Sequence, residues 1–405
     1  MQIGFVGSAY KSRSLPLSAQ RCVNLYLQTD EGKGGKSPVA LIGTPGLRPW
    51  AAPTLPGGAT GGVRALLPLS TGVLLAVVGA YVLRMDASGQ VTGTAGPMGT
   101  AVGPVSVEEN GTAAVMVDGN ARYTVNLTSW AFATISAPAA DRVAFIDGYF
   151  VCNRPNSQQF DISGLFTTTF DALDFAAAEG SPDRLVSLIA DHRELWLFGA
   201  VSTEVWTNTG NVDFPFERLP GAFIQTGCAA PASPARVDNS VFWLGSDRDG
   251  QGIVWRADGY RPQRISTHAI EREIQSYRTF ADAIGMSYQQ DGHTFYLLTF
   301  PAADRTWCYD AATGEWHERA WFDDLNQQRR HRANCIGSFA GNVMVGDWQT
   351  SAIYVLDLDT YTDAGRPIRR IRTAQPIAGP DYQQATHWAL QVDMETGVGD
   401  PASSL

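Results

Sequence analysis

The sequence predicts an all-β protein, a β-propeller of about seven blades with N-terminal and C-terminal β extensions and one short connector helix. Three observations support this fold class. The 405 residues include 41 Gly and 22 Pro, and 10% are aromatic; Gly-rich turns between short aromatic segments are typical of all-β chains. Charged residues make up only 17%, which argues against disorder and against long solvated helices. Short β-like runs recur at a spacing of roughly 40–50 residues, the range of propeller blades.

The repeat extends from about Val63 to about Leu358. Each unit holds two or three runs rich in Val, Leu, Phe, Tyr and Trp, which suit a half-buried pleated surface. One small sheet cannot bury both of its faces alone, so the units are expected to stack radially into a ring. No WD or kelch signature recurs, and the repeat is therefore geometric. The expected unit starts are Val63, Val105, Arg142, Leu185, Ala235, Ala283 and Asn334.

Turn sequences separate the runs within a unit. The segments Asp86–Gly89, Asp118–Asn120, Asp147-Gly148 and Asp291-Gly292 each stand between two apolar runs. Asp, Asn and Gly tolerate the positive φ angles that tight hairpins need. Each segment is therefore predicted to be a β-hairpin turn.

One predicted helix interrupts the repeat. The dipeptide Ser266-Thr267 can cap it, and Ile270 and Ile274 then fall on one apolar face, with Glu271 pointing outward. We expect it to be a connector packed between two blades.

The chain divides into residues 1–60 (an N-terminal extension with the ring-closing strand), 61–360 (the propeller) and 361–405 (the start of a C-terminal β segment). Val39–Ile42, just after Pro38, is the expected closing strand. Trp388–Met394 alternates apolar and polar residues as a strand does.

The segment Gly43–Leu47 (GTPGL) is predicted to be a structural turn. Pro45 presets φ at one central position and Gly46 supplies a positive φ at the next, which is a type II arrangement. Replacing Gly46 is expected to reduce stability.

The net charge is −10 and the pI is near 5.1. A DNA-binding protein normally presents a basic face, so sequence-specific DNA binding is disfavoured.

The five cysteines are widely spaced and odd in number, which indicates buried reduced thiols. The N-terminus lacks the long apolar core of a signal peptide, and the apolar runs are too short to span a bilayer. The chain is expected to be soluble in the cytoplasm where it is made.

Motifs that suggest chemistry are weak. Gly35-Lys36-Ser37 resembles the end of a phosphate-binding loop, but Asp30 stands where the pattern needs Gly. Ser246–Gly252 has two carboxylates beside Gly, without the distant Glu of a calcium loop. A hairpin turn is the preferred interpretation of Ser246–Gly252, and no nucleotide site is expected at Gly35–Ser37.

Two Cys and His pairs also require a choice. His331 with Cys335, and Cys308 with His317, have plausible spacing for a metal, but no repeated pair completes a tetrahedral set. We interpret the cysteines of these pairs as core thiols and the histidines as solvated side chains, in preference to a metal site. The sequence therefore predicts no catalytic, cofactor-binding or metal-binding residues, and no cofactor.

Arginines cluster at two places in this acidic chain. They are either solvated, or they contact an acidic protein partner or DNA phosphate. We take them as the candidate interface: Arg329, Arg330, Arg332, Arg366, Arg369, Arg370 and Arg372.

The exposure of the tryptophans distinguishes a carbohydrate-binding propeller from a structural one. A carbohydrate-binding or carbohydrate-active propeller would use exposed rings as stacking faces, drawn from Trp196, Trp206, Trp243 and Trp255. An enzyme of unknown chemistry is a second alternative. We expect most of the rings in apolar strands to be buried between blades instead: Trp196, Trp206, Trp243, Trp307 and Trp316.

Several segments, in one order, resemble the packaged-DNA stabilisation (tail hub, or nozzle) proteins of short-tailed bacteriophages. Each is weak alone and the set is specific: Gln20–Tyr26, Gly43–Leu47, Phe170–Phe175, Ala178–Asp183, Leu195–Gly199, Glu204–Gly210, Phe214–Phe216, Trp243–Gly245, Ile265–Glu271, Gly292–Tyr296, Phe300-Pro301, Tyr309-Asp310 and Gly314–Arg319.

The resemblance implies a structural virion protein of the tail, synthesised in the bacterial host cytoplasm, and not an enzyme. It implies a homo-oligomeric ring, a hexamer, below the portal and its adaptor. That ring would retain packaged DNA, carry the tail needle, spike or fibres, and let double-stranded genomic DNA pass without specific binding; no membrane is involved in the assembled state. Family members usually continue into a longer C-terminal β domain, whereas this sequence ends at Leu405.

Overall fold

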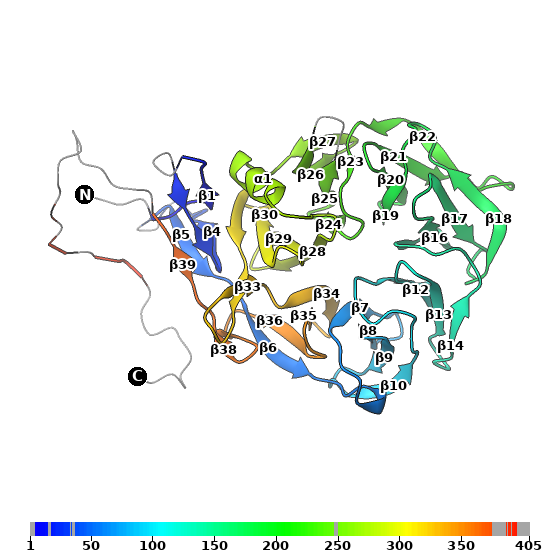
Figure 1. The fold of residues 1–405 in the computed structure, drawn as a ribbon, viewed down its shortest axis with the longest axis horizontal. Helices are drawn as coiled ribbons and strands as arrows, with labels where there is room; N and C mark the ends of the chain where they lie inside the picture. Colours follow the sequence, from blue (N-terminus) through cyan, green and yellow to red (C-terminus); the bar gives the residue numbers. More distant parts are fainter. Residues whose placement is uncertain are drawn as a thin grey trace.

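The computed structural model describes residues 5–14, 18–32, 34, 37–246, 250–374, 386, 388–389 and 391–394. Seven sheets are arranged around a common axis in chain order, as Figure 1 shows. Each sheet is an antiparallel set of four strands or is built on such a set. The predicted seven-bladed β-propeller is confirmed.

The blades follow one another along the chain. Their strands are: in blade 1, β7 (Val63–Pro68), β8 (Leu74–Val78), β9 (Tyr81–Met85) and β10 (Val91–Ala95); in blade 2, β11 (Ser106–Glu109), β12 (Ala113–Val117), β13 (Arg122–Asn126) and β14 (Phe132–Ile135); in blade 3, β15 (Val143–Ile146), β16 (Tyr149–Asn153), β17 (Gln159–Ser163) and β18 (Phe170–Ala177); in blade 4, β19 (Leu185–Asp191), β20 (Glu194–Gly199), β21 (Thr203–Asn208) and β22 (Phe216–Ile224); in blade 5, β23 (Gly227–Cys228), β24 (Ala235–Val237), β25 (Ser240–Ser246), β26 (Gln251–Asp258) and β27 (Arg261–Arg264); in blade 6, β28 (Ile284–Gln290), β29 (His293–Phe300), β30 (Arg305–Asp310) and β31 (Glu315–Glu318); in blade 7, β34 (Ala333–Phe339), β35 (Asn342–Asp347) and β36 (Ile353–Asp357).

The predicted unit starts agree with the first long strand of each blade to within one residue. The predicted hairpin turns are also present. Asp147 (φ 49°) and Gly148 (φ 91°) join β15 to β16, and Asp291 (φ 48°) and Gly292 (φ 78°) join β28 to β29. Positive φ at both central residues matches the twist of the flanking strands.

The ring is closed by the N-terminal segment. Strand β6 (Gly46–Ala51) pairs antiparallel with β36 and supplies the fourth strand of blade 7. The expectation that Val39–Ile42 closes the ring was wrong, because β5 (Val39–Gly43) pairs with β4 (Leu25–Thr29) in a separate hairpin. The apolar content of Val39–Ile42 could not distinguish the two roles, since both place a short β run beside another strand.

Gly46 is needed for a different reason from the one predicted. It is the first residue of β6 and is not among the residues with positive φ, so the type II turn was wrong. A Cβ atom at Gly46 would lie 2.1 Å from the carbonyl oxygen of Thr360. The glycine therefore permits close approach of two backbones.

The core is divided among the seven gaps between neighbouring blades. In β8, Leu75 and Val77 face blade 2, whereas Leu74, Ala76 and Val78 pack against blade 7. This period of two buries both faces of one sheet. Each of the seven hydrophobic clusters joins two adjacent blades.

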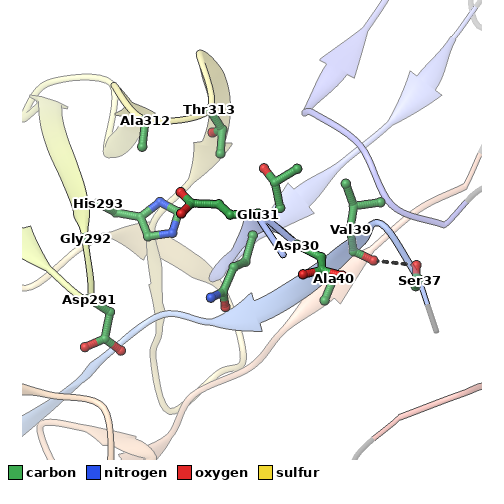
Figure 2. A pocket seen from close by; sticks show the side chains of 12 residues that line it. Asp30, Glu31, Ser37, Val39, Ala40, Asp291, Gly292, His293, Ala312 and Thr313 are labelled. Carbon is green, nitrogen blue, oxygen red and sulfur yellow. Dashed lines mark hydrogen bonds between the residues drawn. The ribbon is translucent and has the colours of Figure 1, made fainter. Parts of the chain in front are cut away.

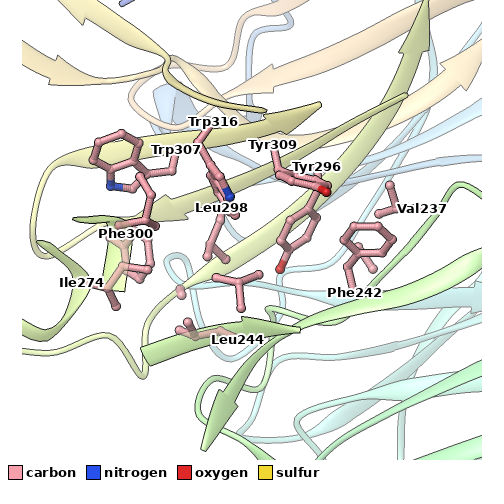
Figure 3. Close-up of a cluster of buried hydrophobic side chains, with 14 of the residues drawn as sticks. Val237, Phe242, Leu244, Ile274, Tyr296, Leu298, Phe300, Trp307, Tyr309 and Trp316 are labelled. Atoms are coloured by element: carbon pink, nitrogen blue, oxygen red, sulfur yellow. The ribbon is translucent and has the colours of Figure 1, made fainter. Parts of the chain in front are cut away.

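The cluster between blades 5 and 6 is rich in aromatic rings (Figure 3). The five tryptophans that were expected to be buried have 9% or less of their surface exposed: Trp196, Trp206, Trp243, Trp307 and Trp316. That prediction is confirmed, and these rings are unavailable as sugar-stacking faces.

Helix α1 (His268–Gln275) follows blade 5 and contacts β26. Thr267 is its N-cap, and its side chain accepts a hydrogen bond from the backbone N–H of Ile270, as predicted. The outward placement of Glu271 was wrong. Its side chain is buried and pairs with Arg264 and with the hydroxyl of Ser266.

The remaining elements lie outside the four-stranded sets. Strands β3 (Cys22–Val23) and β39 (Ile371–Arg372) extend the sheet of blade 6 beyond β31. Three short hairpins join β1 (Tyr10–Lys11) to β2 (Ala19–Gln20), β32 (Ala320–Phe322) to β33 (Gln328–Arg330), and β37 (Thr362–Asp363) to β38 (Arg366–Pro367), and one 3-10 turn covers Pro56–Gly58.

The strand predicted at Trp388–Met394 is absent from the described part of that segment. Trp388 is 94% exposed and Met394 is 68% exposed. Alternation stabilises a strand only where another strand pairs with it, and no described strand lies beside this segment. In the described part of the chain, no helix is long and apolar enough to cross a membrane.

Candidate interface: the terminal seam

The predicted arginines gather where the chain ends meet blades 6 and 7. We call this region the terminal seam. It comprises β1–β3, residues 320–332 (the β32–β33 hairpin and the two residues after it) and residues 361–373, on the left of Figure 1. Residues more than 300 positions apart in sequence meet here, because β39 pairs with β3.

Arg332 is buried within the seam. It is 4% exposed, and its Nε donates to Oδ2 of Asp347 over 2.9 Å. Its guanidinium carbon lies 4.7 Å from the centre of the Trp321 ring. Arg332 is therefore committed to internal contacts.

Arg330 is also buried, at 9% exposure. Its guanidinium lies 4.4 Å from the centre of the Trp348 ring, and its backbone N–H donates to Asp304. Burial lowers the pKa of Arg330 to about 10. Arg330 and Arg332 thus stabilise the seam and are closed to a partner in this conformation.

Three other arginines lie at the surface of the seam. Arg329 pairs with Asp323 (2.8 Å) and Asp304 (3.2 Å), and its side chain remains 40% exposed. A backbone N–H from Gln327, aided by Arg329, holds the pKa of the Asp323 carboxyl below its usual range.

Arg366 pairs with Asp324, and Arg369 donates to the side-chain oxygen of Asn326 while its guanidinium stacks on Phe322. Both arginines are exposed. The adjacent pair Asp323-Asp324 lies beyond the end of β32, and both carboxylates pair with arginines.

Arg372 binds the C-terminal segment to the N-terminal segment, whereas the exposed Arg370 contacts a residue of its own segment. Arg372 donates to the side-chain oxygen of Gln20 (2.5 Å) and to the carbonyl oxygens of Phe5 and Ser8. Arg370 lies over the ring of Tyr361. The structure therefore brings all seven predicted arginines to one region, where they also have partners in the same chain.

Sequence reasoning missed the residues that hold the seam together. Asn24 has φ 54°; its amide donates to the carbonyl oxygens of Ala320 and Arg369 and accepts from the N–H of Ala320. Arg21 pairs with Glu318 through two bonds of 2.9 and 2.8 Å. The only signal was that both lie in the segment Gln20–Tyr26.

A buried polar cluster supports the seam from within. Arg319 is 1% exposed and donates to the Tyr288 hydroxyl, to the Pro45 carbonyl oxygen and to His331. Burial raises the pKa of the nearby Asp363 to about 7. These groups join blade 6, blade 7 and the closing segment.

The Cys and His pairs are structural. His317 and His331 are buried, so the prediction of solvated histidines was wrong. Burial lowers the pKa of His317 to about 3, which keeps its imidazole neutral. Burial also raises the pKa of the Cys308 thiol well above its usual range and that of Cys335 to about 12, so these thiols are protonated at neutral pH. Such groups are poor nucleophiles.

The two weak motifs remain without support. Ser37 donates its hydroxyl to the Val39 carbonyl oxygen, whereas Gly35 and Lys36 lie outside the described residues. Residues 247–249 of the Asp-rich turn also lie outside them. Among the described residues, no group of three or more His, Cys, Asp or Glu is arranged to hold a metal ion.

Comparison with known proteins places this propeller in a class of phage proteins. Residues 1–361 match the family model described as "Bacteriophage P22 Gp10, beta-propeller", a phage stabilisation family. The chain belongs to this family, which confirms the resemblance seen in the sequence. It is a phage structural protein and a virion component, and membership implies a role other than catalysis.

Comparison with solved structures gives information on the fold alone. No curated protein matches the chain. The extracellular domain of a one component system from B. thetaiotaomicron is similar, with a TM-score of 0.52, 11% identity, and coverage of 77% of this chain and 40% of that chain. The extracellular domain described as a hybrid two component system from that organism gives a TM-score of 0.50 with the same identity and coverage. This chain thus spans less than half of either. Virginiamycin B lyase from Staphylococcus aureus gives a TM-score of 0.49, at 10% identity over 73% of this chain and 94% of that chain.

Proposed function

We propose that the chain is a ring-forming tail hub, or nozzle, below the portal and its adaptor, where it retains packaged DNA and forms part of the ejection channel. The observation that carries the proposal is the family match over residues 1–361. Two properties of this chain support it: a rigid disc closed by its own N-terminal strand, and an acidic net charge of −10.

The closed propeller supplies mechanical stability. A four-stranded blade with a hydrophobic cluster on each side cannot leave the ring without exposing two clusters. Closure by β6 joins the first part of the chain to the last blade, so no terminal blade edge is left to separate first. This construction suits a component that carries load from pressurised DNA.

The acidic charge suits a channel wall. A protein that neutralises many phosphates gains affinity by releasing counterions, and a net charge of −10 removes much of that gain. DNA would then slide past without many contacts to break. Retention belongs to a plug and to the partners of the ring.

The exposed arginines of the terminal seam are the proposed contact with a neighbouring subunit or the adaptor. Arg329, Arg366 and Arg369 keep exposed guanidinium groups, and these can pair with carboxylates of another chain. Leu325, at the tip of the β32–β33 hairpin, is 76% exposed beside them. The proposed partners are six copies of the chain in a ring, the adaptor, and the needle, spike or fibre proteins.

The test combines assembly with DNA binding. Native mass spectrometry of the purified chain is expected to show a closed ring, and R366E with R369E is expected to weaken it. The matched control is R193E, an exposed arginine of the β19–β20 turn in blade 4. Filter binding at low salt is expected to show weak duplex affinity. Tight DNA binding that is lost in R366E/R369E while assembly survives would overturn the proposal.

A further inference from the structure

A cavity of about 550 Å³ lies between the β4–β5 hairpin and the turns of blade 6 (Figure 2). One wall comes from residues 28–31, 37, 39 and 40 of the hairpin. The other comes from the β28–β29 turn (Asp291 and Gly292), from His293, and from Ala312 and Thr313 between β30 and β31. The arginines of the terminal seam do not line this cavity, and the function proposed above does not use it.

The groups that face the cavity are mainly hydrogen-bond acceptors. Glu31 and Asp291 supply exposed carboxylates, and Figure 2 shows Glu31 directed toward the ring of His293. Asp30 and the hydroxyl groups of Thr29 and Thr313 also line it. No arginine or lysine of the described residues is among the lining groups.

His293 gives an independent reason to expect a ligand. It is 7% exposed, and its ring stacks on Phe295 and meets Tyr26 edge-on. Its Nδ1 lies 2.7 Å from Oδ2 of Asp310, while its Nε2 has no hydrogen-bond partner among the described residues. A side chain held this firmly presents one unused polar atom to the cavity.

Asp310 determines what that atom can do. This carboxylate is 1% exposed and also accepts from the Thr313 hydroxyl and the backbone N–H of Ala312. In the neutral tautomer whose proton lies on Nδ1, the ring donates that proton to Asp310. In that tautomer Nε2 presents a lone pair to the cavity, which is also lined by carboxylates.

We propose that this acceptor-lined cavity binds an organic cation, either an alkylammonium or a guanidinium group. Such a cation brings several N–H donors and a positive charge, so it can pair with the carboxylates of Glu31 and Asp291 and donate to Nε2 of His293 in the tautomer described above. A metal ion fits less well, because the described residues include no group of three ligands arranged for one. The cation is either a free amine or the side chain of a lysine or arginine in another chain.

Isothermal titration calorimetry of the full chain with n-butylammonium chloride tests the proposal, with 1-butanol as the neutral probe of similar size. We expect one butylammonium per chain and no measurable binding of butanol. E31Q removes one exposed carboxylate and is expected to weaken binding about fivefold. The matched control is D171N, which changes an exposed carboxylate on β18 in blade 3 and is expected to leave binding unchanged.

H293F tests the acceptor itself. It keeps an aromatic ring against Phe295 and Tyr26 and removes Nε2, so binding should fall at least as far as in E31Q; a melting curve checks the fold, and E31Q carries the test if H293F unfolds. A capped peptide with one central lysine identifies the source. Binding of the peptide indicates a side chain of another protein, and binding of butylammonium alone indicates a free amine. Equal binding of butanol and butylammonium, or parental affinity in E31Q, would overturn the proposal.

Discussion

The ion pair between blades 2 and 3 offers a sharp test of how neighbouring blades are joined. Arg122 on β13 makes two bonds of 2.8 and 3.0 Å to Asp161 on β17, and the two side chains are 0% and 1% exposed. Arg154 also donates to Asp161 over 3.0 Å. D161N removes the negative charge and leaves the Arg122 guanidinium buried without compensation.

The expected cost follows from burial. Removing one partner of a buried pair destabilises a protein by about 3–5 kcal/mol, whereas exposed pairs contribute about 0.2–1 kcal/mol. Blades 3 and 4 supply the matched control, because Arg193 pairs with Asp147 at 2.9 Å and its side chain is 83% exposed. D147N removes the same charge there, and Asn tolerates the positive φ of that turn position.

Thermal melting followed by tryptophan fluorescence, at one scan rate, compares the two variants. D161N is expected to melt several degrees below the parent, and D147N is expected to melt close to it. The double variant R122M/D161L is expected to recover part of the loss, because neither buried charge then remains. Equal melting of D161N and D147N would refute the argument from burial.

Three further predictions follow from buried contacts. G46V is expected to prevent ring closure or to lower the melting temperature strongly, because its Cβ would lie 2.1 Å from the Thr360 carbonyl oxygen; normal melting of G46V would contradict this. Burial lowers the pKa of His317 to about 3, whereas the same side chain in the unfolded chain has a pKa of about 6.5. Between about pH 6.5 and pH 3 the unfolded chain therefore binds a proton that the folded chain does not bind. The free energy of unfolding is highest above about pH 6.5 and decreases as the pH falls through this range. H317F should reduce the slope of unfolding free energy against pH there by up to about 1.4 kcal/mol per pH unit, and an unchanged slope would rule out this source. The four buried thiols (Cys22, Cys152, Cys228 and Cys308) are expected to react slowly with a disulfide reagent at pH 8 while the chain is folded, and all five thiols should react in denaturant; rapid reaction of more than one thiol of the folded chain would contradict this burial.

Periodicity and turn chemistry were enough to predict the blades. The positive φ angles of Asp147, Gly148, Asp291 and Gly292 are properties of those residue types, so local sequence determines them. The same holds for Thr267 as a helix cap. Tryptophan burial was also predictable, because strands stacked on both faces leave large rings little room outside the core.

Long-range pairing could not be predicted. Val39–Gly43 and Gly46–Ala51 are both short β segments, and only the partner strand decides which one closes the ring. The outward placement of Glu271 failed because Arg264, in the preceding strand, holds its carboxylate inside.

The candidate site shows the same division. Sequence reasoning grouped the seven arginines by charge, and the structure brings them to one seam. The sequence alone could not distinguish the buried Arg330 and Arg332 from the exposed Arg366 and Arg369, because the residues that contact these arginines lie elsewhere in the chain. The cavity beside His293 gave no local signal at all, because its walls are separated by more than 200 residues.

Cryo-electron microscopy of the intact phage particle tests whether the chain forms a ring around the DNA channel of the tail. We expect a ring of seven-bladed discs in the tail, directly below the portal and adaptor, with the terminal seam of each disc at a contact with a neighbouring chain. A map that places this propeller singly, away from the DNA channel, or that shows the seam facing solvent around the whole ring, would contradict it.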